Sequence, residues 1–183
     1  MKKLSISEMT VCGIFTALLC VLAPMTIPIG PVPISLTNFV LYISIIVLGT
    51  KLSTISYIIY LLIGLVGLPV FSGYVGGPSK FVGPTGGYLV GFVFLTIIGG
   101  IIYEHFKGQP IITGLGMFLG LVICYAFGTV WFMKLMSTGL AESLTMCVWP
   151  FIPLDIVKIV LGVFLGTIIK RSLNKAGLLT GGK

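Results

Sequence analysis

The last long apolar segment of the chain opens with the stretch WPFIPLDIVK, residues Trp149–Lys158. Asp155 is the only acid inside such a segment, and Lys158 is the only cation at that depth. A separation of three residues places both side chains on one face of a helix. A charge buried in hydrocarbon is costly, so an ion at this depth usually faces a partner, a cavity or a substrate. The pair therefore indicates a substrate pocket.

The composition of the chain identifies the class of protein. Of 183 residues, 57% are hydrophobic and only 8% are charged, and the mean hydropathy is +1.19. Such a chain is too apolar for a soluble domain with a wet surface. We therefore expect an all-α integral membrane protein in which residues 1–183 form one domain. The four cysteines show no CxxC or metal-ligand spacing, so they are interpreted as packing residues, with no metal or other cofactor.

The positive charges indicate how the chain is oriented. The formal net charge is +7. Eight cations lie at the termini or in alternate turns: Lys2, Lys3, Lys51, Lys107, Lys170, Arg171, Lys175 and Lys183. The intervening loops hold only Lys80 and Lys134. Because the cation-rich side of a membrane protein is normally cytoplasmic, both termini are predicted to be cytoplasmic and the number of spans even. In a membrane protein this charge indicates orientation and contact with membrane lipid, not nucleic acid.

The apolar segments predict six transmembrane helices. They cover approximately residues 8–23, 34–49, 54–68, 88–103, 111–133 and 153–169. A short amphipathic helix is a further possibility between residues 134 and 147.

Two unusual loops fall on the predicted outer side. Residues 24–33 hold four prolines and no charge; this composition forbids a regular helix. The loop is interpreted as a lid folded against the protein, with a simple linker as the alternative. Residues 73–87 hold six glycines, which let the backbone come close to a ligand or to another segment.

Polar residues from several segments are expected to meet on this outer side. Asp155 falls in the first turn of the last helix, and Ser35, Asn38 and Tyr88 belong to the outer ends of other helices. Convergent polar groups in an apolar cup are typical of a small-molecule site. Two alternatives stay open: the Asp155–Lys158 pair holds the bundle together, and Asn38 bonds a neighbouring helix instead of lining a cavity. An ion pair within one helix is expected to be a poor staple, because it joins no two helices.

Catalysis has little support in the sequence. There is no second intramembrane carboxylate, no placed nucleophile and no metal cluster. There is also no Walker motif, so energy for uphill transport has to come from a partner or an ion gradient. A binding subunit that is not an enzyme fits better. The competing hypotheses are a small integral-membrane enzyme acting on lipid and a scaffold that only assembles helices.

Four blocks of the sequence resemble the BioY family. They are PVPISLTN at 31–38, GLVGLPVF at 64–71, GPTGGYLVGF at 83–92 and FIPLDIVK at 151–158. BioY proteins are the biotin-binding S components of energy-coupling factor (ECF) transporters. The resemblance implies a six-helix S-component fold in a bacterial or archaeal cell (inner) membrane. It also implies high-affinity capture of biotin from outside and docking to a transmembrane T component that carries two ATPase subunits. An S component for another vitamin is the related alternative.

The resemblance also suggests roles for individual residues. Asp155 and Lys158 are similar to the polar anchors of the biotin site. Asp155 is suited to accept from a ureido N–H, whereas Lys158 suits either the ureido oxygen or the valerate carboxylate.

The remaining site and docking residues follow from the same resemblance. Tyr88, with the adjacent Gly86 and Gly87, resembles the wall that packs on the fused rings. The proline-rich loop resembles a gate, and Asn38 is a weaker candidate. The family's Ala-x-x-x-Ala docking face on the first helix corresponds here to Gly13 and Ala17, so the first small residue differs.

Overall fold

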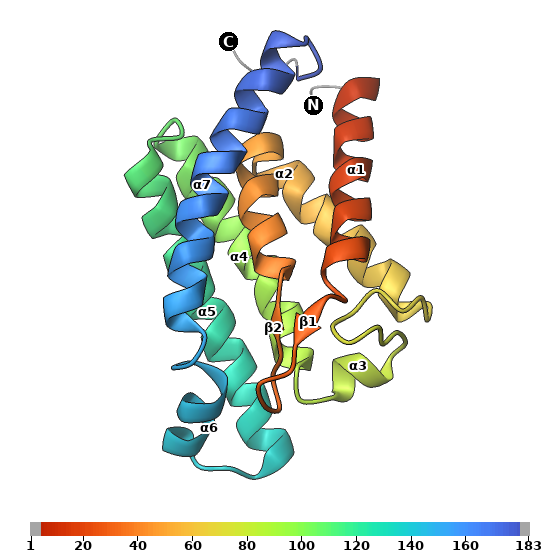
Figure 1. The fold of residues 1–183 in the computed structure, drawn as a ribbon, viewed down its shortest axis with the longest axis vertical. Coiled ribbons are helices and arrows are strands. Elements are labelled where there is room, and N and C mark those ends of the chain that lie inside the picture. The colour runs from red at the N-terminus through yellow and green to blue at the C-terminus, as the bar shows by residue number, and fades with distance from the viewer. Residues whose placement is uncertain (1–4, 180–183) are drawn as a thin grey trace.

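The computed structural model describes residues 5–179, and it is mostly helical (Figure 1). The elements in chain order are α1 Ile6–Leu22, β1 Thr26–Ile27, β2 Ile34–Ser35, α2 Thr37–Leu65, α3 Ser79–Val82, α4 Gly86–His105, α5 Pro110–Met136, α6 Leu140–Cys147 and α7 Ile152–Lys175. The predicted short helix between residues 134 and 147 is confirmed as α6.

Among residues 5–179, four helices are long and apolar enough to cross a membrane: α2, α4, α5 and α7. Helix α1 is apolar but shorter, at 17 residues. It begins at a capping box in which the Ser5 hydroxyl accepts from the Glu8 N–H and the Glu8 carboxylate accepts from the Ser5 N–H. The chain is therefore a multi-pass helical membrane protein.

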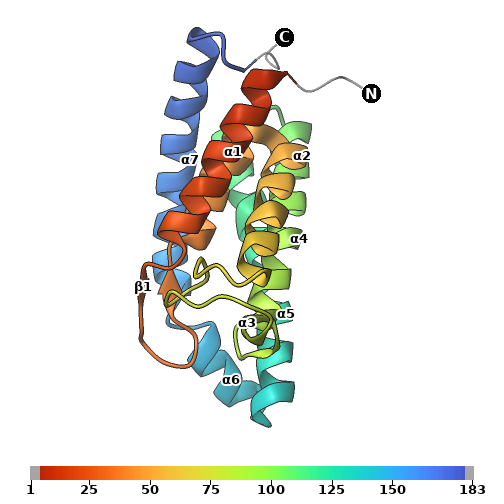
Figure 2. The same ribbon diagram turned by 90° about the vertical axis from the view of Figure 1, so that its right-hand side faces the viewer.

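Helix α2 contains a break at Gly49 that separates its two apolar halves. Gly49 has φ 75° and ψ −176°, a region open essentially to glycine alone. The first half rises toward the end of the molecule where α1 begins, and the second half returns toward the opposite end (Figures 1 and 2). The Thr50 N–H, at the start of the second half, donates to Glu104 Oε1 of α4 at 2.7 Å. The two halves correspond to the predicted segments 34–49 and 54–68.

Helix α7 packs closely on the first half of α2. Gly162 faces Tyr42, and a Cβ added to Gly162 would lie 2.8 Å from the Tyr42 Cβ. Gly166 faces Ile46 in the same way one turn later. This close approach at two glycines one turn apart places the first turn of α7 beside the start of α2.

The short elements and the two long loops lie at one end of the molecule. The β1–β2 hairpin, α3 and α6 lie at this end, which we call the hairpin end (Figure 1). The start of α1 and the end of α7 lie at the other, which we call the terminal end. The proline-rich segment forms the antiparallel hairpin, with Thr26 opposite Ser35. The Gly73 N–H donates to the Pro24 carbonyl at 3.1 Å and so ties the glycine-rich loop to the hairpin.

The basic residues follow the predicted division between the two ends. Lys51 lies next to the break in α2, and Lys170 and Lys175 lie in the last turns of α7, all toward the terminal end (Figure 1). Lys80 lies in α3 at the hairpin end. Lys2, Lys3 and Lys183, which contributed to the orientation prediction, lie outside the described residues.

Candidate functional site

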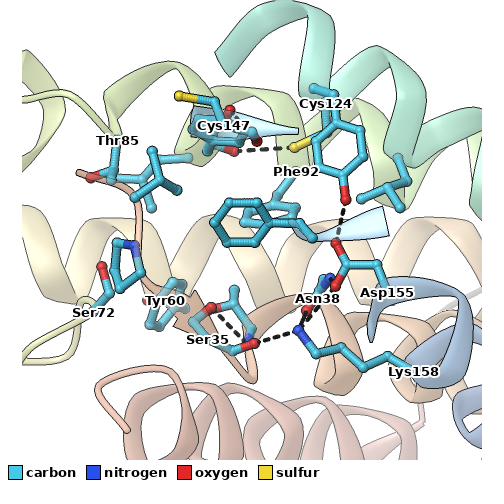
Figure 3. A pocket seen from close by; sticks show the side chains of 18 residues that line it. Ser35, Asn38, Tyr60, Ser72, Thr85, Phe92, Cys124, Cys147, Asp155 and Lys158 are labelled. Atoms are coloured by element: carbon cyan, nitrogen blue, oxygen red, sulfur yellow. Dashed lines mark hydrogen bonds and ion pairs between the residues drawn. The ribbon is translucent and has the colours of Figure 1, made fainter. Parts of the chain in front are cut away.

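A cavity lies inside the hairpin end, between β2 and helices α2, α4, α5, α6 and α7. The cavity is narrow in this structure, with a volume of about 70 Å³. Its lining is mainly apolar and aromatic. A group of charged and amide side chains occupies one end, and Ser72 and Thr85 lie at the other (Figure 3).

The charged end of the cavity is built on Asp155 and Lys158, one turn apart at the start of α7. Their side chains form an ion pair of 3.0 Å. The Lys158 ammonium also donates to Asn38 Oδ1 at 3.1 Å and to the Ser35 carbonyl at 2.8 Å. The Asn38 amide nitrogen donates to Asp155 Oδ1 at 2.8 Å. Asp155 is only 3% exposed and Lys158 only 7%, so the pair is held away from water.

Tyr125 of α5 completes this group. Its hydroxyl donates to Asp155 Oδ2 at 2.5 Å (Figure 3). Sequence reasoning missed this residue. Tyr125 lies in an apolar run, where an aromatic side chain is normally part of the packing, and no local signal shows which way its hydroxyl points. We refer to Ser35, Asn38, Tyr125, Asp155 and Lys158 as the polar network.

The polar network joins four parts of the fold. Lys158 binds β2 through Ser35 and α2 through Asn38, and Asp155 binds α5 through Tyr125. The expectation that the ion pair would join no two helices is therefore wrong, because each ion has further partners on other elements. The two alternatives for Asn38 are both realised, since it bonds α7 and also lines the cavity.

Tyr88 lies in the wall of the cavity, as predicted. It is 7% exposed, and its hydroxyl donates to the Cys147 carbonyl of α6 at 3.1 Å. Cys124 and Cys147 line the cavity as well, and both are free thiols. The hydrogen bond from Tyr88 therefore attaches the short helix α6 to the wall formed by α4.

The neighbouring glycines have a different place from the one predicted. Gly86 and Gly87 do not line the cavity in the described structure; Thr85, Tyr88 and Leu89 do. A side chain on Gly87 would meet Trp131 and the Phe127 carbonyl of α5. Gly87 therefore permits close packing of α4 on α5, and Gly86 permits close approach to α3, where an added Cβ would meet the Phe81 carbonyl.

Comparison with known proteins agrees with this architecture. The BioY family model matches residues 1–175. The chain belongs to the BioY family. It is 36% identical over 159 residues to the biotin transporter BioY of Thermotoga maritima, covering 87% of this chain and 93% of that one. It is 36% identical over 151 residues to the probable biotin transporter BioY of Pyrococcus horikoshii, covering 82% and 88%.

A solved structure has the same fold. The crystal structure of the S-component for biotin from an ECF-type ABC transporter superposes with a TM-score of 0.85 at 30% identity. The match covers 91% of this chain and 92% of that chain. The similarity thus extends over both the cavity and the helices around it.

In this BioY-family chain the predicted docking face of α1 is open. Gly13 and Ala17 are both exposed, whereas Cys12 and Thr16 on the other side of the helix are buried against α2. No described atom lies within 4 Å of the position a Gly13 Cβ would take. Packing within the described part of the chain therefore does not account for this small-residue pair.

Proposed function

We propose that this chain is the biotin-binding, substrate-specific subunit of an ECF transporter. One observation carries the proposal: in a BioY-family chain, a buried ion pair with amide and phenol partners forms one end of an apolar cavity. Biotin combines a polar ureido ring with an apolar ring system and chain, so it matches a cavity of this composition. The family and its relatives are transporter components, so the chain is not an enzyme, and the lipid-modifying alternative is set aside.

Individual residues have distinct roles in this proposal. Asp155 accepts from a ureido N–H, and Asn38 and Ser35 hold Lys158 beside it. Tyr88 contributes the wall on which the fused rings pack, while Gly86 and Gly87 act indirectly by letting α4 lie close to α3 and α5. The β1–β2 hairpin, whose Val32 is 8% exposed and lines the cavity, acts as the lid.

The decisive experiment is calorimetry of the purified protein in detergent, titrated with biotin and, in competition, with thiamin and riboflavin. We expect saturable binding of biotin that neither other vitamin displaces, and biotin among the small molecules that copurify, identified by mass spectrometry. Preference for another vitamin would reassign the substrate. Absence of saturable binding by any of them would contradict the proposal.

We also infer that residues 1–183 form a single domain that crosses a bacterial or archaeal cell membrane six times. Both termini are then in the cytoplasm. Support comes from the break at Gly49, which divides α2 into two apolar halves, and from the position of Lys51 beside it. Single cysteines replacing Lys51 and Lys134, in a background without native cysteines, test the topology. An impermeant thiol reagent applied to intact cells should label only the cysteine at position 134. Equal labelling of both would contradict the topology.

The exposed face at Gly13 and Ala17 is proposed to dock the T component, which brings the ATPase subunits. Gly13→Leu should abolish copurification with these subunits, because its bulk prevents close helix approach, and should leave biotin affinity unchanged. Val122→Leu, a substitution on an exposed position of α5, is the matched control. Normal copurification of Gly13→Leu would place the docking face elsewhere.

A further inference from the structure

The polar network has no unused positive charge for a carboxylate ligand. The Lys158 ammonium has three N–H donors, and they are taken by Ser35, Asn38 and Asp155. Asp155 also balances its charge at 3.0 Å. A second carboxylate at this end would compete with Asp155 for one cation and leave a net negative charge away from water, which is costly. The polar network therefore suits a neutral polar group.

The opposite end of the cavity has a second cation nearby. The Lys80 ammonium donates to the carbonyl of Ser72 at 3.1 Å, and Ser72 lines the cavity at the end away from Asp155 (Figure 3). Lys80 is half-buried, and among residues 5–179 the Ser72 carbonyl is its one hydrogen-bond partner. Burial lowers the pKa of Lys80. A nearby anion would oppose this effect and stabilise the charged form.

The local backbone holds the turn that contains Ser72 in place. Phe71 and Val75 form a bridge around the turn that contains Ser72, and the Gly73 N–H donates to the Pro24 carbonyl. Lys80 therefore reaches a turn that is tied on one side to the β1–β2 hairpin. An anion bound beside Lys80 would add a contact at the point where the two outer loops meet.

We propose that Lys80 binds the carboxylate of the ligand at the Ser72–Thr85 end, while the ligand's neutral hydrogen-bonding ring meets the polar network at the other end. This assignment rests on the proposed function. It fixes the orientation of the ligand in the cavity, because the two ends of a ligand such as biotin differ in charge. Lys80 is then a determinant of specificity for carboxylate-bearing ligands, and Lys158 positions Asp155 and Asn38.

The test compares biotin with biotin amide, its neutral carboxamide, by calorimetry at pH 7. Lys80→Met should weaken biotin binding at least about tenfold, equivalent to about 1.4 kcal/mol, and change affinity for the amide less than about twofold. Lys80→Arg should retain most of the biotin affinity, because the guanidinium keeps the charge. Lys134→Met, which removes an exposed cation from the same side, should change neither affinity.

Several outcomes would overturn the assignment. Equal weakening of both ligands by Lys80→Met would reduce Lys80 to a structural role in the loop, and no change in either would remove it from the site. Selective loss of biotin over biotin amide in Lys158→Met would place the carboxylate at the polar network instead. A wild-type protein that binds neither ligand would overturn the proposed function itself, an outcome distinct from wild-type binding that Lys80→Met leaves unchanged.

Discussion

Two polar clusters lie at opposite ends of this protein, and they differ in access to water. At the hairpin end, Asp155 and Lys158 are buried and find their partners on β2, α2 and α5. At the terminal end, Lys170 donates to the Tyr103 hydroxyl at 2.9 Å and lies 4.8 Å from the centre of its ring. Glu104 caps the second half of α2 there, and it is exposed.

Depth, rather than charge, separates the roles of the two clusters. A polar group at the surface exchanges a lost protein contact for water, so exposed pairs contribute about 0–1 kcal/mol. A buried ion that loses its partner has no such replacement, and the cost is about 3–5 kcal/mol. We therefore expect changes at the hairpin end to affect both ligand binding and stability, and changes at the terminal end to affect stability alone.

The largest expected effect comes from Asp155→Ala. It leaves the Lys158 ammonium buried without its counter-ion, so the free energy of unfolding should fall by about 3–5 kcal/mol and biotin binding should be lost. Thermal unfolding and calorimetry in detergent measure the two effects. Lys170→Ala, at a partly buried position of the terminal end, is the control and should change neither by more than about 1 kcal/mol. Unchanged biotin affinity in Asp155→Ala would remove the carboxylate from the site.

Tyr125→Phe should have the next largest effect at the hairpin end. Loss of the hydroxyl removes one hydrogen bond to a buried carboxylate, which costs about 1.5–3 kcal/mol and should weaken biotin binding about tenfold or more. Tyr74→Phe is the control, because it removes the hydroxyl of an exposed tyrosine in the glycine-rich loop. Similar calorimetric results for the two variants would show that the Tyr125 hydroxyl has no special role.

Gly49→Ala tests the terminal end through the backbone. The φ of 75° with ψ of −176° is strained for any residue with a Cβ, so the variant should lose about 1–3 kcal/mol of stability. Biotin affinity of the folded protein should stay the same, because the cavity lies at the other end. Gly13→Ala, at an exposed helical position, should be neutral or slightly stabilising. A large loss of biotin affinity in Gly49→Ala would show that the two ends are coupled.

The smallest effect is expected for Glu104→Gln. The carboxylate accepts from the Thr50 N–H at the start of a helical half, where a negative charge is favourable by about 0.3–1 kcal/mol. The thermal midpoint should therefore fall slightly while calorimetry with biotin shows no change. Lys107→Gln, on the adjacent exposed turn, controls for charge removal alone. A midpoint shift no greater than that of the control would mean that the cap contributes nothing measurable.

Much of the candidate site was predictable from the chain alone, and the part that was not has a common cause. Ser35, Asn38, Tyr88, Asp155 and Lys158 were all predicted, and all line the cavity. Asp155 and Lys158 stand out because ionisable residues inside apolar membrane segments are rare. Tyr125 was missed because the sequence does not show how α5 is oriented about its axis. Only that orientation brings the Tyr125 hydroxyl to Asp155 of α7.

The glycines illustrate the same difficulty. The GPTGGY block correctly indicated a close approach of backbone, but its partner is the α5 backbone near Phe127 and not a ligand. A glycine in a motif indicates a close neighbour, but it does not show whether that neighbour is a ligand or another segment of the chain. The segments on either side of Gly49 were predicted as separate helices, and the non-helical φ and ψ of Gly49 divide α2 into two helical halves at that residue.

The amino-acid sequence by itself determined the class of protein, the positions of the apolar segments and the sorting of basic residues between the two ends. These properties depend on local composition, because a run of apolar residues has to satisfy its backbone within itself when no water is present. Only the tertiary structure decided which side chains meet Asp155 and Lys158. That outcome depends on the rotation of each helix about its axis, which is set by contacts with neighbouring helices such as Gly162 on Tyr42.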